Sequence, residues 1–243
     1  MPSRWQVQFE IPDIRRTELH QLHGLVSHWL EGPLSVEDHH ANRKPFCLSP
    51  LERVEGDVWR TTIGLLDDAL PERLMEQVVA TGGQIRLGGQ QCRVVLDGDS
   101  PLNCIRAASW GALLAQASPQ RLFTFTFLTP TTFRAGRNYQ PLPAPSSVFG
   151  HYQAVWEAFG PPDSGVGVDL RDAGLFVDHL DGATAKAQVR RNTATGFVGT
   201  VTYRATLADP QVLEALDALA EIAEFSGTGA QTTHGLGVTE RVR

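Results

Sequence analysis

A glycine-rich stretch near the C-terminus contains the residue types best suited to holding a phosphate group. Residues 224–238 (EFSGTGAQTTHGLGV) combine four glycines with six hydroxyl, amide or imidazole side chains. Glycine lacks a Cβ, so it adopts positive φ and can leave successive N–H groups facing outward, which makes a concave site for anionic oxygens. The stretch therefore predicts a phosphate-binding loop between a helix and a strand, with an ordinary glycine turn as the alternative.

Histidines are concentrated in the first half of the chain. Five of the eight histidines lie between residues 20 and 40, and four of them are the candidates for chemistry: His20, His23, His39 and His40. Imidazole has an ordinary pKa of about 6.5, so both protonation states exist near neutrality and the group serves as an acid or a base. Imidazole also binds zinc, but no carboxylate or cysteine has ligand spacing with these histidines. We therefore favour acid–base chemistry and expect no metal or other cofactor.

The charge balance is acidic, with a formal net charge of −6 over 243 residues. Proteins that bind nucleic acids usually present a basic surface. Here nearly all of the positive charge is arginine, since Lys44 and Lys186 are the only lysines. Arginine suits forked recognition of phosphate and stacking on bases. A negative net charge is thus compatible with a groove in which arginines make the surface locally basic.

The composition is that of an ordinary soluble protein, with 42% hydrophobic and 20% charged residues. No apolar run approaches the roughly 18 residues of a membrane span, and the first residues lack the apolar core of a signal peptide. We expect a cytoplasmic protein without membrane contact. The three cysteines, Cys47, Cys92 and Cys104, have no C-x-x-C spacing and are interpreted as core thiols.

Hydrophobic periodicity gives the same order of elements twice. In the first half it predicts strands and helices at 4–11, 15–30, 45–54, 57–66, 69–80, 84–87 and 91–97. In the second half it predicts them at 121–128, 146–159, 184–191, 195–206, 210–223 and 236–242. Both halves read βαββαβ. The expected fold class is α+β, with two tandem ferredoxin-like (RRM-like) domains, residues 1–118 and 119–243, and a central cleft.

Four segments, in order along the chain, carry a resemblance to a known family. They are DHHANRKPFCLSPL at 38–51, FTFLTPTTFR at 125–134, GFVGTVTYRA at 196–205 and EFSGTGAQTTHGLGV at 224–238. The chain resembles the CRISPR-associated endoribonucleases of the RAMP superfamily, which process precursor CRISPR RNA. The resemblance implies antiviral defence, repeat-RNA binding and metal-independent cleavage within each repeat, leaving 2′,3′-cyclic phosphate and 5′-hydroxyl ends.

RNA cleavage without a metal uses the ribose 2′-hydroxyl as nucleophile, so it needs a base, an acid and donors for the charged phosphorane. The resemblance places the active site between the first helix and the glycine-rich loop. It implies His40 as the base, with His39 as the close alternative, because either fits the histidine upstream of Lys44-Pro45-Phe46. Lys44 would stabilise the phosphorane or the leaving oxygen, and His23 or His20 would replace the tyrosine that many members place in the first helix.

The remaining histidines outside the glycine-rich loop, His28, His151 and His179, are interpreted as packing or surface residues. The RNA-binding residues expected from the arginines and the loop are Arg134, Arg137, Arg190, Arg191, Gly227, Gly229, Gln231, Thr232, His234, Gly235 and Gly237. The expected partner is CRISPR repeat RNA or crRNA, with other CRISPR effector subunits as further candidates, and the expected state is a monomer or homodimer. The alternative function is a non-catalytic RAMP-type subunit that binds crRNA in an effector complex.

Overall fold

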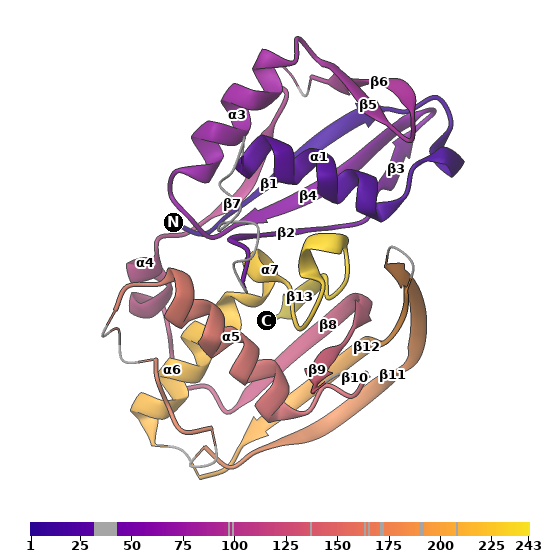
Figure 1. Cartoon of the computed structure of the whole chain (residues 1–243). Helices are drawn as coiled ribbons and strands as arrows, with labels where there is room; N and C mark the ends of the chain where they lie inside the picture. The colour runs from indigo at the N-terminus through magenta and orange to yellow at the C-terminus, as the bar shows by residue number, and fades with distance from the viewer. Residues whose placement is uncertain are drawn as a thin grey trace.

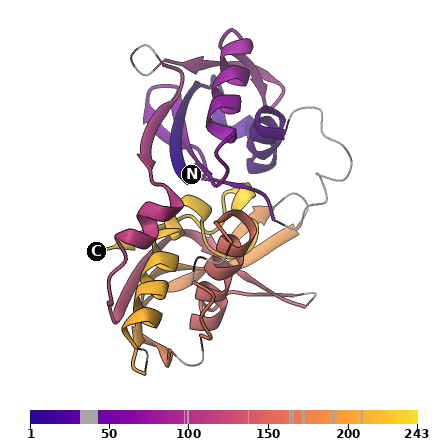
Figure 2. The same ribbon diagram turned by 90° about the vertical axis from the view of Figure 1, so that its left-hand side faces the viewer.

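The computed structural model describes residues 1–31, 43–96, 98, 100–136, 138–162, 164, 166–170, 173–189, 192–207 and 209–243. These residues form two large sheets, one above the other in Figure 1, each with helices packed on one face, and a small two-stranded ribbon. The short helix and turn that precede the last strand, drawn in yellow, lie between the two large sheets in both views (Figure 2). The C-terminal glycine-rich stretch is therefore positioned where the two halves meet.

The first half is a ferredoxin-like domain. Its elements are β1 (Ser3–Glu10), η1 (Ile14–Arg16), α1 (Leu19–Glu31), β2 (Phe46–Leu48), β3 (Glu52–Glu55), β4 (Val58–Leu65), α3 (Leu70–Ala80), β5 (Gln84–Leu87), β6 (Gln90–Val95) and β7 (Asn103–Ala107). The strand order is β2-β4-β1-β6-β5, with β3 paired to β4 and β7 paired to β1. The central strand β1 is antiparallel to each of its neighbours.

The second half repeats this arrangement. Its elements are α4 (Trp110–Ala115), β8 (Leu122–Thr131), β9 (Phe133–Ala135), β10 (Asn138–Gln140), α5 (Pro145–Phe159), β11 (Leu175–Val189), β12 (Asn192–Ala205), α6 (Pro210–Glu221), α7 (Ala223–Ser226), η2 (Thr232–His234) and β13 (Thr239–Val242). The strand order β11-β12-β8-β13 matches β2-β4-β1-β6 position by position. The prediction of two tandem ferredoxin-like domains is confirmed.

Each half has its own core, built from the periodicities of its elements. In the first domain, α1 buries the side of the helix that carries Leu22, Val26 and Trp29, and the Trp29 ring stacks on Phe9 of β1 with centroids 6.2 Å apart. In the second domain, the inward residues of β8 meet the predicted apolar face of α5. These residues are Phe123, Phe125, Phe127, Val148, Phe149, Tyr152, Val155 and Trp156. Burial of these faces fixes which side of α1 and of α5 remains for other contacts.

Several elements differ from the sequence predictions. No element was predicted between the strands at 91–97 and 121–128, but the structure has β7 there, which extends the first sheet, and α4, whose Leu113 packs in the second core. The predicted hairpin at 184–206 is longer, because β11 already begins at Leu175. Cys104 is exposed, so the interpretation of all three cysteines as core thiols was wrong for this residue.

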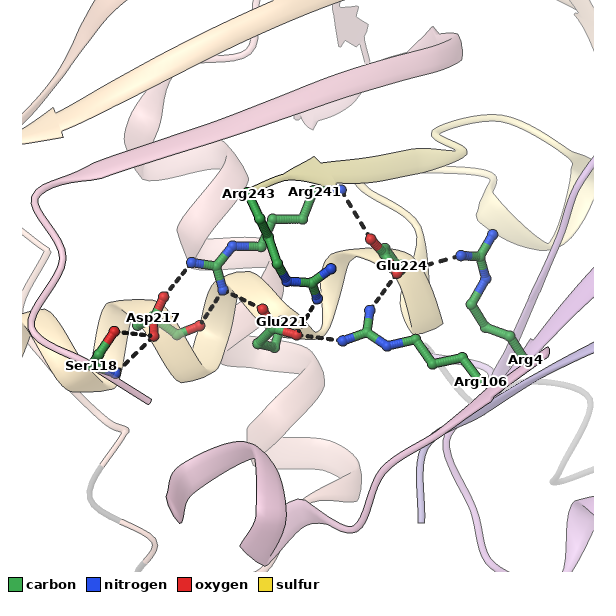
Figure 3. Close-up of polar contacts among 8 residues, drawn as sticks. All are labelled: Arg4, Arg106, Ser118, Asp217, Glu221, Glu224, Arg241 and Arg243. Atoms are coloured by element: carbon green, nitrogen blue, oxygen red, sulfur yellow. Dashed lines mark hydrogen bonds and ion pairs between the residues drawn. The ribbon is translucent and has the colours of Figure 1, made fainter. Parts of the chain in front are cut away.

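A cluster of arginines and carboxylates joins the two domains (Figure 3). Arg106 of β7 pairs with Glu221 of α6 and with Glu224 of α7, and Glu224 also accepts a hydrogen bond from Arg4 of β1 at 3.4 Å. The side chain of Glu224 is 10% exposed. Because charges removed from water need partners, these contacts hold the first sheet against the helices of the second domain.

The same cluster continues to the C-terminal strand. Arg241 of β13, whose side chain is 4% exposed, pairs with Asp217 and, at 2.6 Å, with Glu221, while Arg243 reaches Glu221 at 2.8 Å. Burial alone would raise the pKa of Glu221, but Arg243, Arg241 and Arg106 outweigh it and hold that pKa below its usual value. The acids at 209–224 thus partly serve to bind arginines within the protein.

None of the helices in the described part of the chain combines the length and the apolar character that crossing a bilayer requires.

Candidate active site

A pocket of about 710 Å³ lies where the two domains meet. Arg43 and Lys44, which immediately precede β2, form its wall from the first domain. The second domain contributes Arg134 of β9, one side of α5, and the glycine-rich loop from Gly229 to Thr233. Three cationic side chains therefore face one cavity in a protein of negative net charge. Such a cavity attracts a polyanion locally.

The glycines of the loop allow backbone segments to approach one another closely. Gly227, Gly229, Gly235 and Gly237 all have φ between 65° and 86°. A Cβ at Gly237 would overlap the Thr228 carbonyl, and one at Gly229 would overlap the Thr132 carbonyl. Glycine is thus required at these positions by conformation and space together.

The amide groups of this loop are largely used within the protein. Ala230 N donates to Thr132 O at 2.7 Å, and Gly237 N donates to Pro130 O at 3.2 Å. The amides of Gly227 and Gly235 donate to Ala223 O and Thr232 O. The expectation of successive N–H groups facing outward was therefore wrong for these residues, because positive φ folds the loop onto its own carbonyls and those of β8. The side chains of the pocket are better placed than these amides to receive a phosphate.

His23 of α1 meets the glycine-rich loop directly. Its Nδ1 lies 2.9 Å from the Thr233 carbonyl oxygen, and its ring stacks on that of His234 with centroids 3.9 Å apart. Because a carbonyl only accepts, Nδ1 is the protonated nitrogen in this contact. The ring of Phe46 of β2 also stacks near that of His23, with centroids 6.1 Å apart. The first helix and the loop are thus joined next to the pocket.

His20 lies one turn earlier on the same helix but has different surroundings. Its Nδ1 is 3.1 Å from Glu18 Oε2, and its side chain is 41% exposed. Of these two histidines, His23 is therefore the one whose described contacts are with the loop. His39 and His40 lie outside the described residues, as do Arg137, Arg190 and Arg191.

The other predicted binding residues fall into two groups. Lys44, Arg134, Gly229, Gln231 and Thr232 line the pocket. The second group does not line the pocket and consists of Gly227, His234, Gly235 and Gly237. His234 is 8% exposed, and Gly235 packs against Leu19 and Pro50 of the first domain.

The sequence interpretation missed two pocket residues that matter for the chemistry, Arg43 and His151. His151 of α5 lines the pocket, although it was interpreted as a packing or surface residue. Burial, and to a smaller extent the positive charge of Arg43, lower its pKa, while a hydrogen bond with the Gly227 backbone raises it, and together they bring the pKa to about 4. The imidazole is therefore neutral at physiological pH. Its position beside Tyr152 in an apolar helix face gave no signal in the sequence.

Within the described residues, no group of three or more histidine, cysteine or acidic side chains is arranged to hold a metal ion. His20 and His23, the described members of the histidine set, have separate partners in Glu18 and Thr233.

The chain is a protein of two ferredoxin-like domains, in which a glycine-rich loop of the second domain packs on the first helix of the first beside a cationic pocket. The sequence model of the CRISPR-associated endoribonuclease Cas6 family matches residues 125–239. Together with the structural similarity over the whole chain described next, this match confirms the resemblance to the Cas6 endoribonucleases.

Solved structures of Cas6 proteins are similar over the full length. The product complex of Cas6 (TTHB231) from Thermus thermophilus is 27% identical, with 100% of this chain and 99% of that chain covered and a TM-score of 0.82. The product complex of a second Thermus Cas6 (TTHA0078) is also 27% identical, with the same coverage and a TM-score of 0.80.

A Cas6-related protein from Pyrococcus furiosus shares the fold, with a TM-score of 0.67 at 10% identity and coverage of 100% of this chain and 99% of that one. No match was found among curated protein sequences.

Proposed function

We propose that the protein binds CRISPR repeat RNA and cleaves the precursor transcript within each repeat without a metal ion. The observation that carries the proposal is the pocket in which Arg43 and Lys44 of the first domain face Arg134 and the glycine-rich loop of the second. The similarity to Cas6 proteins solved with a product and with a substrate mimic supports RNA as the ligand.

The reaction begins at the ribose 2′-hydroxyl beside the scissile phosphate. A base removes its proton, the oxygen attacks phosphorus, and the 5′-oxygen of the next nucleotide leaves with a proton from an acid. The products are a 2′,3′-cyclic phosphate and a 5′-hydroxyl. We assign the base to His40 or His39, which precede the pocket residue Lys44 by four and five positions in the sequence.

Lys44 would stabilise the negative charge that develops on the phosphorane. Its ammonium is a compact charge that needs no fixed fork geometry, and a partly enclosed cavity screens that charge less than open water does. Arg43 and Arg134 would bind neighbouring phosphates and set the register of the RNA. Both arginines line the same pocket as Lys44.

His23 is better suited to positioning than to proton transfer in this proposal. Its Nδ1 and its ring face are both engaged with the loop, at Thr233 and at His234. It would keep the loop and the first helix in register so that Lys44 and Gln231 line the same cavity. His20, with its exposed pair to Glu18, would have no role in the reaction.

The direct test is incubation with repeat RNA from the genome that encodes the chain, in buffer containing EDTA. Cuts at one position, leaving a 2′,3′-cyclic phosphate and abolished by a single 2′-deoxy substitution there, are expected. Tight binding with intact RNA would instead favour the non-catalytic crRNA-binding subunit. His40→Ala and His39→Ala, tested separately, should identify the base by a loss of at least about 100-fold. If both variants keep the full rate, the assigned site is wrong.

A further inference from the structure

An exposed aromatic ring lies beside the pocket on the small ribbon formed by β9 and β10. Tyr139 is 38% exposed and pairs in register with Arg134, which lines the pocket. The guanidinium carbon of Arg134 is 5.9 Å from the centre of the Tyr139 ring. An aromatic face and a cation are therefore presented together at the edge of the cavity.

A strained residue in the glycine-rich loop fixes the orientation of this ring. Gln231 has φ 64° and ψ 27°, and it is the only non-glycine residue with positive φ in the described ranges. Its side-chain Nε2 donates to the Tyr139 hydroxyl at 3.2 Å. Residues other than glycine adopt this conformation at a cost, and such residues persist where surrounding contacts hold them, often at functional sites.

Gln231 also anchors the turn that carries His234. Its carbonyl accepts hydrogen bonds from His234 N at 2.9 Å and from Leu236 N at 3.4 Å. One residue thus connects the turn that stacks on the first helix with the exposed ring of the ribbon.

The ribbon itself is fixed to the loop through Thr132. The Thr132 hydroxyl donates to Gln140 O at 3.1 Å, and the Thr132 carbonyl accepts from Ala230 N at 2.7 Å. Tyr139, the neighbour of Gln140, is therefore held at a defined position relative to the pocket. A side chain that is already ordered loses little conformational freedom when a ligand packs on it.

We propose that Tyr139, flanked by Arg134, is a stacking platform for one unpaired base of the bound RNA close to the cleaved linkage. The inference rests on the proposed function and adds to it a residue that contacts a base. Every base has a π-face, so stacking on an aromatic ring gives affinity without a fixed base identity. Since the Tyr139 hydroxyl already accepts from Gln231, its ring face is the main surface offered to the RNA.

The test measures binding of a repeat RNA made uncleavable by 2′-deoxy substitution at the cut site. Tyr139→Ala is expected to weaken binding about tenfold or more, within the range found when an aromatic stacking partner is removed. Tyr139→Phe keeps the ring and should remain within about threefold of the unmodified protein. Phe176→Ala is the matched control, because Phe176 is also an exposed aromatic residue, at 43%, but its cross-strand partner Arg204 does not line the pocket, whereas the partner of Tyr139, Arg134, does.

A set of RNAs with single abasic positions then locates the base. One abasic position should weaken binding to the unmodified protein by about the same factor as Tyr139→Ala weakens binding to the intact RNA. The Tyr139→Ala variant should bind that abasic RNA as well as it binds the intact RNA. The inference is overturned if Tyr139→Ala binds the RNA within twofold of the unmodified protein. It is also overturned if the variant and every abasic position weaken binding independently, so that their fold-losses multiply at all positions. Failure of the unmodified protein to bind any repeat RNA would instead refute the proposed function, and the platform with it.

Discussion

The rings of His23 and His234 lie stacked, with centroids 3.9 Å apart and planes inclined by 21°. The two residues come from opposite ends of the chain, one from the first helix of the first domain and the other from the last loop of the second. Their contact, with the hydrogen bond from His23 to Thr233 O, joins the domains beside the pocket. Whatever binds in the pocket contacts residues of both domains.

The first prediction separates positioning by His23 from proton transfer. In His23→Ala both the hydrogen bond and the stacking are lost, and we expect cleavage to slow about tenfold, since one hydrogen bond contributes roughly 1 kcal/mol. His23→Asn places an amide donor near the position of Nδ1 and should recover most of the rate. His20→Ala, on the same helix and facing Glu18, should stay within about twofold. If Asn is as inactive as Ala, His23 is a catalytic residue rather than a positioning one.

The second prediction concerns the arginine and carboxylate cluster between the domains. Glu224→Gln removes the negative charge that faces Arg4 and Arg106, both of which are largely buried. We expect the free energy of unfolding in urea to fall by roughly 2–3 kcal/mol, because a buried charge without its partner is costly. Arg243→Ala, at a position whose side chain is 57% exposed, should cost less than about 1 kcal/mol. Equal effects of the two changes would show that the cluster does not hold the domains together.

The third prediction is a pH dependence of stability from His151. Burial lowers the pKa of His151 to about 4, against about 6.5 in the unfolded chain. Between these values the unfolded chain binds more protons than the folded one, so stability decreases as the pH falls from 6.5 to 4. The loss should reach up to about 3 kcal/mol across this window.

His151→Gln should flatten the stability curve between pH 6.5 and 4, as measured by urea unfolding at several pH values. Glu221 affects stability in a lower pH range. Because its pKa is lowered in the folded protein, its ionised form stabilises the fold above pH 4.5, and this stabilisation is lost only as the pH falls below that value. The variant should therefore keep the steeper loss at the acidic end. Parallel curves for the variant and the unmodified protein would rule out the assigned neutral state of His151.

Much of the fold could be predicted from the sequence because burial on one side leaves a pattern. Strand β8 alternates Phe123, Phe125 and Phe127 with threonines, and helix α5 repeats apolar residues on one face. Strand β7 carries no such signal, since the residues from Asn103 to Ala107 are mostly exposed. It is held by backbone pairing with β1. Backbone pairing leaves no pattern of side chains from which the strand could be predicted.

The site was predictable to a smaller extent. The glycine-rich loop was identified by residue type and Lys44 through the family resemblance, and both line the pocket. The positions of His151 and Tyr139 depend on how α5 and the β9–β10 ribbon pack against the loop, which is a long-range contact. The use of the loop amides by Thr132 and Pro130 depends in the same way on β8. Local sequence does not specify these relations.

The most direct test of the account is the single-turnover cleavage rate of repeat RNA, at saturating protein and in EDTA, for Lys44→Met and Lys186→Met. These residues are the only lysines in the chain, and only Lys44 lines the pocket. We predict that Lys44→Met lowers the rate at least about 100-fold, as expected for loss of a group that stabilises the transition state, while Lys186→Met leaves it within about threefold. A Lys44→Met protein that cleaves at the unmodified rate would contradict the assignment of this pocket as the place where the RNA bond breaks.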